Sequence, residues 1–275
     1  MKQLEHMLIL DRSEDASERD PLYPFALDEL LCRHTGQGGP SICHIWRHPR
    51  AFIMGIRDSR LPQAREAAEW LATQGYETAV RNSGGAAVPL DLGVVNLSLI
   101  LPKQGIGDKH FHSDFELMYQ LIQAALLETG RTVDKGEIEG AYCPGDYDLS
   151  MNGLKFCGIA QRRQSQAYIV QAFVICSGSG QASAQLVRDF YARAAGESSA
   201  PDGHPLVTDD RTASLAELIG LGSDAAPSFA GAVKRVIRAA QHADRVAAAS
   251  GQLWLPEQAA VHAMAAELRG RYGVK

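Results

Sequence analysis

Short runs of apolar and β-branched residues, bounded by Gly, Pro, Asn, Asp or Ser, recur between about residues 40 and 180. Runs of this length and composition are typical of β-strands. The first two flank His48-Pro49-Arg50, which predicts a hairpin between them. The segment GGAAVPLDLG, between the third and fourth runs, is expected to form a loop. The strand-like runs are ICHIWR, AFIMGI, TAVRNS, VVNLSLIL and AYIVQAFVIC.

The clearest turn signal is Asn152-Gly153, between DLSM and LKFCGI. A two-residue type I′ turn needs positive φ at both central positions, and Asn-Gly tolerates this best. In the register of such a hairpin, Ser150 faces Lys155 and Asp148 faces Cys157. Lys155 and Cys157 are two positions apart, so we expect both side chains on the same face of the strand.

Other segments carry apolar residues at helical spacing. The first has Pro62 in its first turn and Gly75 as its stop. The second has Ser113 and Glu116 at capping-box spacing and ends at Gly130. The predicted helices are LPQAREAAEWLATQG, SDFELMYQLIQAALLETG, ASAQLVRDFYARAAG, ASLAELIG, AAPSFAGAVKRVIRAAQHADRVAAA and LPEQAAVHAMAAELRGRYG.

Strands mixed with helices, followed by a helical C-terminal third, predict an α+β fold in which helices pack on one sheet. We expect a single domain over residues 1–275, with a core at about 40–180 and a helical part at about 180–275. The polar segment 197–213 is the one stretch with the composition of a linker.

The composition is ordinary for a globular protein, with 45% apolar and 21% charged residues. A net charge of −5 argues against a nucleic-acid-binding protein, and no apolar run is long enough to cross a membrane. The N-terminus lacks the features of a signal peptide. Five cysteines without CxxC spacing suggest free thiols, so we expect a cytoplasmic protein. They are Cys32, Cys43, Cys143, Cys157 and Cys176.

Cys143 precedes a Pro-Gly turn, and Lys155 lies twelve residues further along, beyond the predicted hairpin turn. An ammonium group beside a thiol favours the thiolate and can stabilise the oxyanion of a tetrahedral intermediate. The pair therefore suggests acyl transfer through a thioester. The alternative is a buried, inert cysteine and a solvated lysine. Cys157, two residues from Lys155, is a rival nucleophile.

The pair Gly84-Gly85 follows a strand-like run. It is either a flexible connection or bare backbone laid along a ligand, where a side chain would clash.

Two longer stretches carry a family resemblance. RNSGGAAVPLDLG resembles the R-R-x-S-G-G-G-A-V-x-H-D-x-G signature of the lipoate-protein ligase and octanoyltransferase superfamily, and DLSMNGLKFCGIAQRR resembles its second signature, which ends in K-x-x-G-x-x-Q-R. The strand pair IWRHPRAFIMGIRDS is also similar. The resemblance spans about residues 40–180 in the right order. It implies a biotin/lipoate protein ligase-like fold, related to class II synthetases, with a mixed β-sheet and helices packed on it.

The resemblance also implies roles for single residues. Lys155 would contact the acyl carbonyl, and Gly84 and Gly85 would cover the acyl chain. The remaining matches to the two signatures are Arg81, Ser83, Asp91, Asp148 and Gly158, of which Asp148 and Gly158 are expected to be structural.

Departures from the ligase pattern favour one subfamily. The third glycine and the histidine of the first signature are Ala86 and Leu90 here, and the asparagine that follows the signature in ligases is Val94. These changes argue against adenylation, so neither ATP nor a metal is expected. The context CPGDYDL is similar to the cysteine-dependent lipoyl-relay amidotransferases, with Cys143 as the acyl carrier and Cys157 filling space. Their donor is the octanoylated glycine cleavage H protein, and their acceptors are lipoyl domains of 2-oxoacid dehydrogenases.

Three alternatives stay open: an octanoyltransferase that uses octanoyl-acyl carrier protein, an ATP-dependent lipoate ligase, and a non-catalytic binder of lipoyl domains. Arg162 and Arg163 are either contacts for an acidic lipoyl domain or ordinary surface charges. The histidines of SICHIWRH and of KHFHSDF (His110 and His112) lack a nearby third metal ligand.

Overall fold

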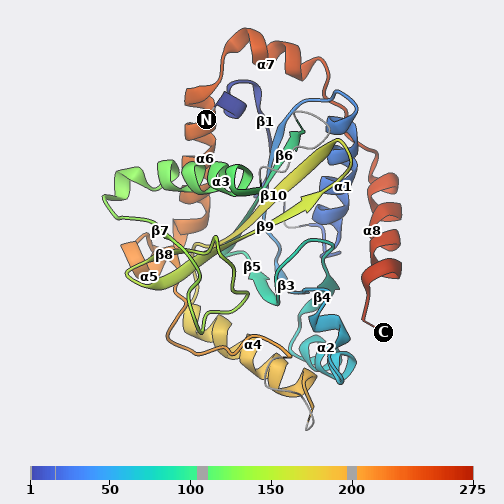
Figure 1. Ribbon diagram of the computed structural model, residues 1–275, viewed down its shortest axis with the longest axis vertical. Coiled ribbons are helices and arrows are strands. Elements are labelled where there is room, and N and C mark those ends of the chain that lie inside the picture. Colours follow the sequence, from blue (N-terminus) through green and yellow to red (C-terminus); the bar gives the residue numbers. More distant parts are fainter. Residues whose placement is uncertain (1, 16, 104–110, 197–202, 275) are drawn as a thin grey trace.

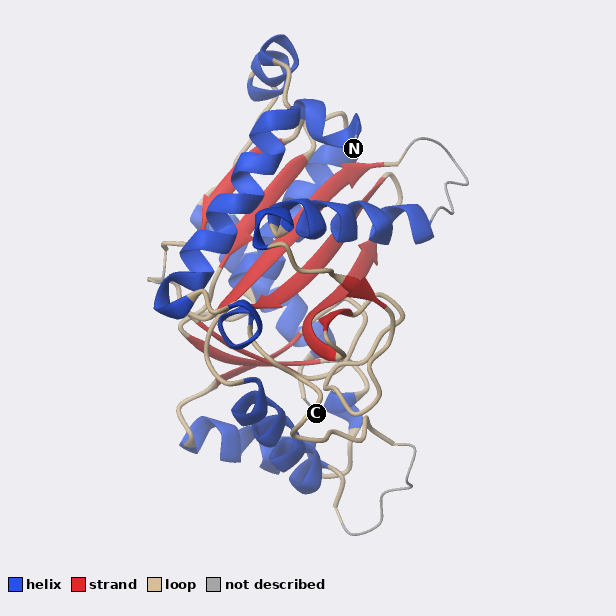
Figure 2. Cartoon of the chain, turned by 90° about the vertical axis from the view of Figure 1, so that its left-hand side faces the viewer, coloured by secondary structure: helices blue, strands red, loops and turns tan. Residues whose placement is uncertain are grey.

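The computed structural model describes residues 2–15, 17–103, 111–196 and 203–274. Within these residues a seven-stranded sheet has the order β1-β2-β6-β10-β9-β8-β7, and a three-stranded sheet has the order β4-β3-β5 (Figures 1 and 2). Each sheet combines one parallel pair, β1-β2 or β3-β4, with antiparallel pairs. The strands are β1 Leu8–Arg12, β2 Ile42–Trp46, β3 Arg50–Met54, β4 Glu77–Val80, β5 Val88–Asp91, β6 Val94–Pro102, β7 Asp134–Lys135, β8 Leu149–Met151, β9 Leu154–Arg163 and β10 Ala167–Ile175.

Helices cover both faces of the large sheet. Helix α1 packs on β6 and β10 with α8 outside it, whereas α3 and α6 cover the opposite face (Figure 1). Helices α2 and α4 lie together at the end of the molecule that carries the small sheet (Figure 1). The helices are α1 Tyr23–Gly36, α2 Ala64–Thr73, α3 Phe111–Ala125, α4 Gly180–Ala194, α5 Leu215–Ile219, α6 Ala225–Ala240, α7 Ala243–Ser250 and α8 Gln258–Tyr272, with short 3₁₀ turns at Lys2–His6, Asp58–Arg60, Leu127–Thr129 and Gly222–Asp224.

The central strand β6 shows how the sheet separates two cores. Val95, Leu97 and Leu99 belong to the apolar cluster under α3 and α6. The alternate residues Asn96 and Ser98 face α1 instead, because successive side chains of a strand point to opposite faces. Both are buried. Two polar side chains in a fully buried strand mark the face on which the candidate site lies.

The predicted hairpin around His48-Pro49-Arg50 is wrong. Strand β2 pairs with β1 and β6 in the large sheet, whereas β3 pairs with β4 and β5 in the small one. Every residue of β2, and every residue of β3 after Arg50, is buried. Runs buried on both faces lack alternation, so the pattern does not reveal their partners. The predicted loop GGAAVPLDLG contains the unpredicted strand β5.

The Asn152-Gly153 turn is confirmed, since φ is 53° at Asn152 and 76° at Gly153. Ser150 pairs with Lys155 as predicted, but Cys157 pairs with Leu149 rather than with Asp148. A β-bulge causes the shift, because Phe156 is an extra residue between the two pairs. The bulge also reverses the alternation. Lys155 lies near Phe173 on the α1 side, whereas Cys157 belongs to the core under α3 and α6, so the prediction of a shared face is wrong.

Most predicted helices are confirmed, with changes at their ends. Helix α3 begins at Phe111, so Ser113 lies within it rather than at its N-cap. Gly130 ends the following 3₁₀ turn in the left-handed conformation. The long helix predicted for 225–249 breaks at Gln241-His242 into α6 and α7. Among the described residues, none of the helices combines the length and apolarity needed to cross a bilayer.

The described part of the predicted linker, residues 203–213, is held against the large sheet. The Lys155 N–H donates to Arg211 O at 2.9 Å, and the Ala213 N–H donates to Lys155 O at 2.9 Å. This segment therefore extends the pairing around Lys155 and is no free linker. Residues 197–202 lie outside the described part of the chain.

Candidate active site

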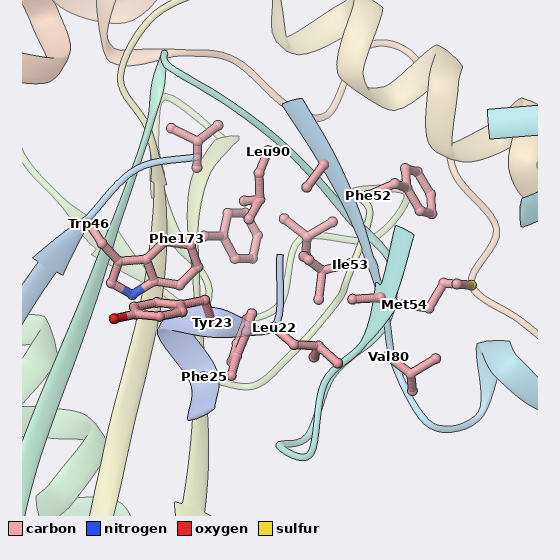
Figure 3. Close-up of a cluster of buried hydrophobic side chains, with 14 of the residues drawn as sticks. Leu22, Tyr23, Phe25, Trp46, Phe52, Ile53, Met54, Val80, Leu90 and Phe173 are labelled. Atoms are coloured by element: carbon pink, nitrogen blue, oxygen red, sulfur yellow. The ribbon is translucent and has the colours of Figure 1, made fainter. Parts of the chain in front are cut away.

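A cavity of about 440 Å³ lies between the α1 side of the large sheet, the small sheet and two loops. Its volume falls in the range of small-molecule sites. One loop runs from Arg81 to Gly85, and the other from Cys143 to Tyr147. The apolar side chains that line the cavity come from α1, β2, β3, β5 and β10 (Figure 3). They include Phe25, Trp46, Ile53, Leu90 and Phe173.

Cys143 reaches this cavity from the loop before β8. Its backbone has φ of 50°, a left-handed conformation that residues other than glycine seldom adopt, and 7% of the residue is exposed. Two donors point at its sulfur. Arg81 Nη2 lies 3.3 Å from Cys143 Sγ, and the Ala86 N–H lies 3.2 Å from it. A cationic donor and a backbone amide together stabilise negative charge on the sulfur.

The guanidinium of Arg81 is fixed by its own loop. Arg81 Nε donates to Gly84 O at 2.9 Å, and Nη2 also donates to Ala86 O. Arg81 is buried. A planar group held at two points can direct its remaining hydrogen bond with little loss of entropy. The positive charge beside the sulfur is therefore that of Arg81.

Of the two predicted loop glycines, Gly85 is the one that sterics require. It has φ of +94°, and a Cβ there would lie 3.0 Å from Cys143 Sγ and 2.5 Å from Arg81 Nη2. A Cβ on Gly84 would meet nothing within 4 Å. The bare backbone at Gly85 thus accommodates the sulfur and the guanidinium.

Lys155 is fully buried and holds the other side of the cysteine loop. Its Nζ donates to Tyr142 O at 2.9 Å and to Cys143 O at 2.6 Å, and it forms an ion pair with Asp148 at 2.8 Å. The ammonium group thus makes two hydrogen bonds and one ion pair, none of them to the thiol. Lys155 contacts the main chain of Cys143 rather than its thiol, so its predicted role at the acyl carbonyl stays a prediction.

Both side chains of the Lys155–Asp148 ion pair are buried. Burial raises the pKa of Asp148 to about 6, against the lowering effect of the Lys155 ammonium. Asp148 also accepts backbone hydrogen bonds from Gly145 and Ile138. The carboxylate thus joins the loop of Cys143 to β9, which agrees with the structural role expected for it.

The other predicted residues divide into two groups. Ser83 and Gly158 line the cavity with Arg81, Gly84, Gly85 and Cys143. Gly158 needs its missing side chain, because a Cβ there would lie 2.5 Å from the Phe173 ring. Asp91 does not join them. It is exposed at the end of β5, where its Oδ1 accepts from the Gly93 N–H at 2.7 Å.

The remaining four cysteines are fully buried in the apolar cores. Cys157 faces the cluster under α3 and α6, and burial raises the pKa of its thiol. Burial also raises the thiol pKa of Cys32, Cys43 and Cys176. Each fits the role of an inert core residue.

A buried tyrosine supports the Gly84-Gly85 loop, and no sequence motif predicts this contact. The Tyr191 hydroxyl accepts from the Ala87 N–H at 3.2 Å and donates to Asp58 Oδ1 at 3.0 Å. Asp58 Oδ2 accepts from the Gly55 N–H at 2.7 Å. These residues come from α4 and from the turn after β3, so only the tertiary structure brings them to the loop.

The paired arginines bind within the chain. Arg162 forms an ion pair with Glu29 at 3.2 Å, and Arg163 forms one with Asp114 at 2.6 Å. Across the described residues there is no group of three or more His, Cys, Asp or Glu placed to hold a metal ion. The His110 and His112 side chains lie outside the described part of the structure.

Comparisons with known proteins point to one family. Residues 20–240 match the lipoyl protein ligase A/B catalytic domain. An Exiguobacterium sibiricum protein named octanoyl-GcvH:protein N-octanoyltransferase is 40% identical over 215 residues, covering 78% of each chain. A Listeria monocytogenes protein named lipoyl-GcvH:protein N-lipoyltransferase is 41% identical over 175 residues, 62% of each chain.

The fold agrees as well. A bi-partite lipoate protein ligase from Thermoplasma acidophilum superposes with a TM-score of 0.62 at 18% identity, covering 98% of this chain and 96% of the other. The predicted lipoate ligase-like fold, a mixed sheet packed with helices and followed by helices α6 to α8, is thereby confirmed. The chain belongs to the lipoyl protein ligase A/B catalytic domain family.

Proposed function

We propose that the protein is a cytoplasmic octanoyl amidotransferase that works through a thioester on Cys143. The donor is the octanoylated H protein of the glycine cleavage system, and the acceptor is a lysine of a 2-oxoacid dehydrogenase lipoyl domain. The names of the similar proteins support the donor. The observation that carries the proposal is the Cys143 sulfur, which lies at an apolar cavity and accepts hydrogen bonds from Arg81 and the Ala86 N–H.

In the first half-reaction, the sulfur of Cys143 attacks the octanoyl amide carbonyl on the donor lysine. The C–N bond breaks, the amine leaves with the proton that the thiol gave up, and an S–octanoyl bond remains. An amide is more stable than a thioester, so this step is uphill. It is productive when the acceptor removes the acyl group quickly.

In the second half-reaction, the amine of the acceptor lysine attacks the thioester. The new C–N bond forms as the C–S bond breaks, and the proton that the amine gives up restores the thiol. The departing sulfur returns to its two hydrogen-bond donors. The same groups that favour attack by the sulfur therefore favour its departure. Asp146, a carboxylate at the cavity next to Pro144-Gly145, is placed to attract the cationic lysine of the acceptor before it gives up its proton.

Arg81 and Lys155 divide the electrostatic tasks. Arg81 contacts the reacting sulfur directly. Lys155 fixes the carbonyls of Tyr142 and Cys143 and so keeps Cys143 in its left-handed conformation. Contact between Lys155 and the acyl oxygen requires the ammonium to exchange one of its three partners.

The octanoyl chain lies in the cavity against the apolar side chains that line it (Figure 3). Burying a methylene group contributes about 0.8 kcal/mol, so a chain of this length gains several kcal/mol. Leu97 and Ile159 also border the cavity, although their side chains belong to the core under α3 and α6.

The test is transfer between purified proteins. Octanoylated H protein, octanoyl-acyl carrier protein, or octanoate with ATP is supplied with a lipoyl domain whose mass is followed. We expect an octanoyl mass increase with the H protein donor and without nucleotide. Transfer from acyl carrier protein alone would identify the related octanoyltransferase activity, and transfer that requires ATP would identify a ligase. No transfer from any donor would favour a binding protein.

A further inference from the structure

The cavity is not apolar throughout. Trp46 Nε1, Ser83 Oγ, Asn96 Nδ2 and Gln171 Oε1 are buried atoms that have no hydrogen-bond partner among the described residues, and all four residues line the cavity. Trp46, Ser83 and Asn96 are each more than nine-tenths buried. Buried polar groups almost always have partners. Such a cluster indicates a wall that binds hydrogen-bonding groups.

The sheet register places two of these groups away from the cysteine. In one row across the sheet, Gly158 of β9 pairs with Phe173 of β10, and Phe173 pairs with Asn96 of β6. Gly158 is close to Lys155, which holds the Cys143 loop. Asn96 is two strands further, about 10 Å at the usual strand spacing. In the next row, Gln171 pairs with Ser98.

A buried carboxylate organises this wall. Asp28 of α1 accepts from Ser98 Oγ at 2.5 Å, from Gln171 Nε2 at 3.0 Å and from His44 Nδ1 at 2.8 Å. Because Gln171 Nε2 is held by Asp28, its Oε1 is left as an acceptor toward the cavity. The polarity of the wall is therefore built into the fold.

We propose that the amides of Asn96 and Gln171 form a polar end wall that limits the length of the acyl chain. An alkyl chain that stops before the wall leaves both amides hydrated, whereas a longer chain displaces the water and leaves the amides without hydrogen-bond partners. Groups that accept from Asn96 Nδ2 or donate to Gln171 Oε1 are tolerated at this wall, and methylene groups are rejected. The inference rests on the proposed function for the identity of the acyl chain, but the wall can be tested without transfer.

The probe is a series of alkyl methanethiosulfonates with 6 to 14 carbons. The Cys143 thiolate attacks the sulfenyl sulfur and releases methanesulfinate, which leaves the alkyl chain attached to Sγ through a disulfide. The other cysteines are fully buried, and intact mass and peptide mapping verify single labelling at Cys143. The melting temperature of each labelled protein then reports how well its chain fits the cavity.

The test variant is Asn96→Leu, which keeps the branching at Cγ and removes the unpartnered Nδ2. The matched control is Thr212→Val, because Thr212 Oγ1 is also buried and unpartnered within the described residues but lies outside the cavity lining. In the wild type and in Thr212→Val, we expect the melting temperature to rise up to about eight carbons and then fall. In Asn96→Leu we expect the melting temperature of the labelled protein to keep rising with longer chains.

The same variant changes selectivity in transfer. We expect its preference for octanoyl over dodecanoyl H protein to fall about tenfold. A wild-type melting temperature that rises steadily to 14 carbons, or an Asn96→Leu profile that coincides with the wild type, would overturn the end wall. Absence of octanoyl transfer with an intact labelling profile would instead count against the proposed function alone.

Discussion

Cys143 and Cys157 lie close in the sequence, on either side of one hairpin turn, yet their surroundings are opposite. Cys143 lies in a strained loop at the cavity, where a guanidinium and a backbone amide donate to its sulfur. Cys157 lies in a strand and is enclosed by the core under α3 and α6, where burial raises the pKa of its thiol. A single bulged residue, Phe156, separates the face of Lys155 from that of Cys157.

The comparison teaches that proximity in sequence to a lysine does not activate a thiol. The sulfur needs directed donors and an opening to the cavity, and the Gly84-Gly85 loop provides both for Cys143. Lys155 is used to fix the backbone of the reactive loop. The following predictions test this division.

The largest effect is expected from replacing Cys143 and Cys157 in separate variants. Cys143→Ser should lower octanoyl transfer to a lipoyl domain by at least about 10³-fold, because the hydroxyl is a poorer nucleophile and leaving group. Cys157→Ala should transfer within about threefold of the wild type and cost about 1 kcal/mol of folding free energy. Mass spectrometry of the acceptor measures transfer by both variants, and denaturant titration measures the folding free energy of Cys157→Ala. Equal losses in the two variants would contradict the distinction between the thiols.

Removing Lys155 should damage the fold as well as the site. Lys155→Met leaves Asp148 buried without its cation, which should lower the free energy of unfolding by about 3–5 kcal/mol in denaturant titrations at pH 7. The double variant Lys155→Met/Asp148→Asn removes the unpaired charge and should recover at least half of that loss. If the single variant is as stable as the wild type, the pair does not hold the loop.

Arg81→Met should slow alkylation of Cys143 by iodoacetamide at pH 7 by about 10- to 100-fold, because hydrogen bonds to charged groups contribute about 1.5–3 kcal/mol. Arg81→Lys keeps the charge but loses the fixed fork, so its rate should be intermediate. Peptide mapping follows the alkylated Cys143, and circular dichroism controls for folding. An unchanged rate in Arg81→Met would show that the guanidinium does not stabilise the thiolate.

The smallest effect concerns pH. The folded state raises the pKa of Asp148 to about 6 from 3.8, so it binds this proton more tightly than the unfolded chain does. The contribution of Asp148 to stability is therefore fully present below about pH 4, and it is lost as the pH rises to about 6. The loss is about 1–3 kcal/mol. Urea unfolding should show that the free energy of unfolding of the wild type falls relative to that of Asp148→Asn across that interval. A difference between the two proteins that stays constant with pH would contradict this prediction.

Much of the site followed from local sequence. The paired signatures located Arg81, Ser83, Gly85 and Gly158, and the CPGDYDL context located Cys143; the fold brings all five to one cavity. Local sequence could not show that Arg81 rather than Lys155 contacts the sulfur, because that contact joins two loops that are distant in the sequence. The separate faces of Lys155 and Cys157 were hidden as well, because a single bulge at Phe156 decides them. The tyrosine support of the glycine loop and the polar end wall both depend on contacts between distant segments.

Prediction of the fold from local sequence has the same limit. Helical periodicity and the Asn152-Gly153 turn identified most elements, since both are local signals. The assignment of β2 and β3 to one hairpin failed because both strands are buried on both faces and carry no alternation. The pairing of residues 211–213 with Lys155 was hidden for another reason, because a polar segment with the composition of a linker forms it.

The most direct test of the acyl-enzyme is intact-mass analysis of the protein incubated with octanoylated H protein and no acceptor, quenched in acid. A single octanoyl adduct on Cys143, released by hydroxylamine, formed by Cys157→Ala and lost in Cys143→Ser, is the predicted result. Full transfer by Cys143→Ser, or an adduct that resists hydroxylamine, would contradict the account.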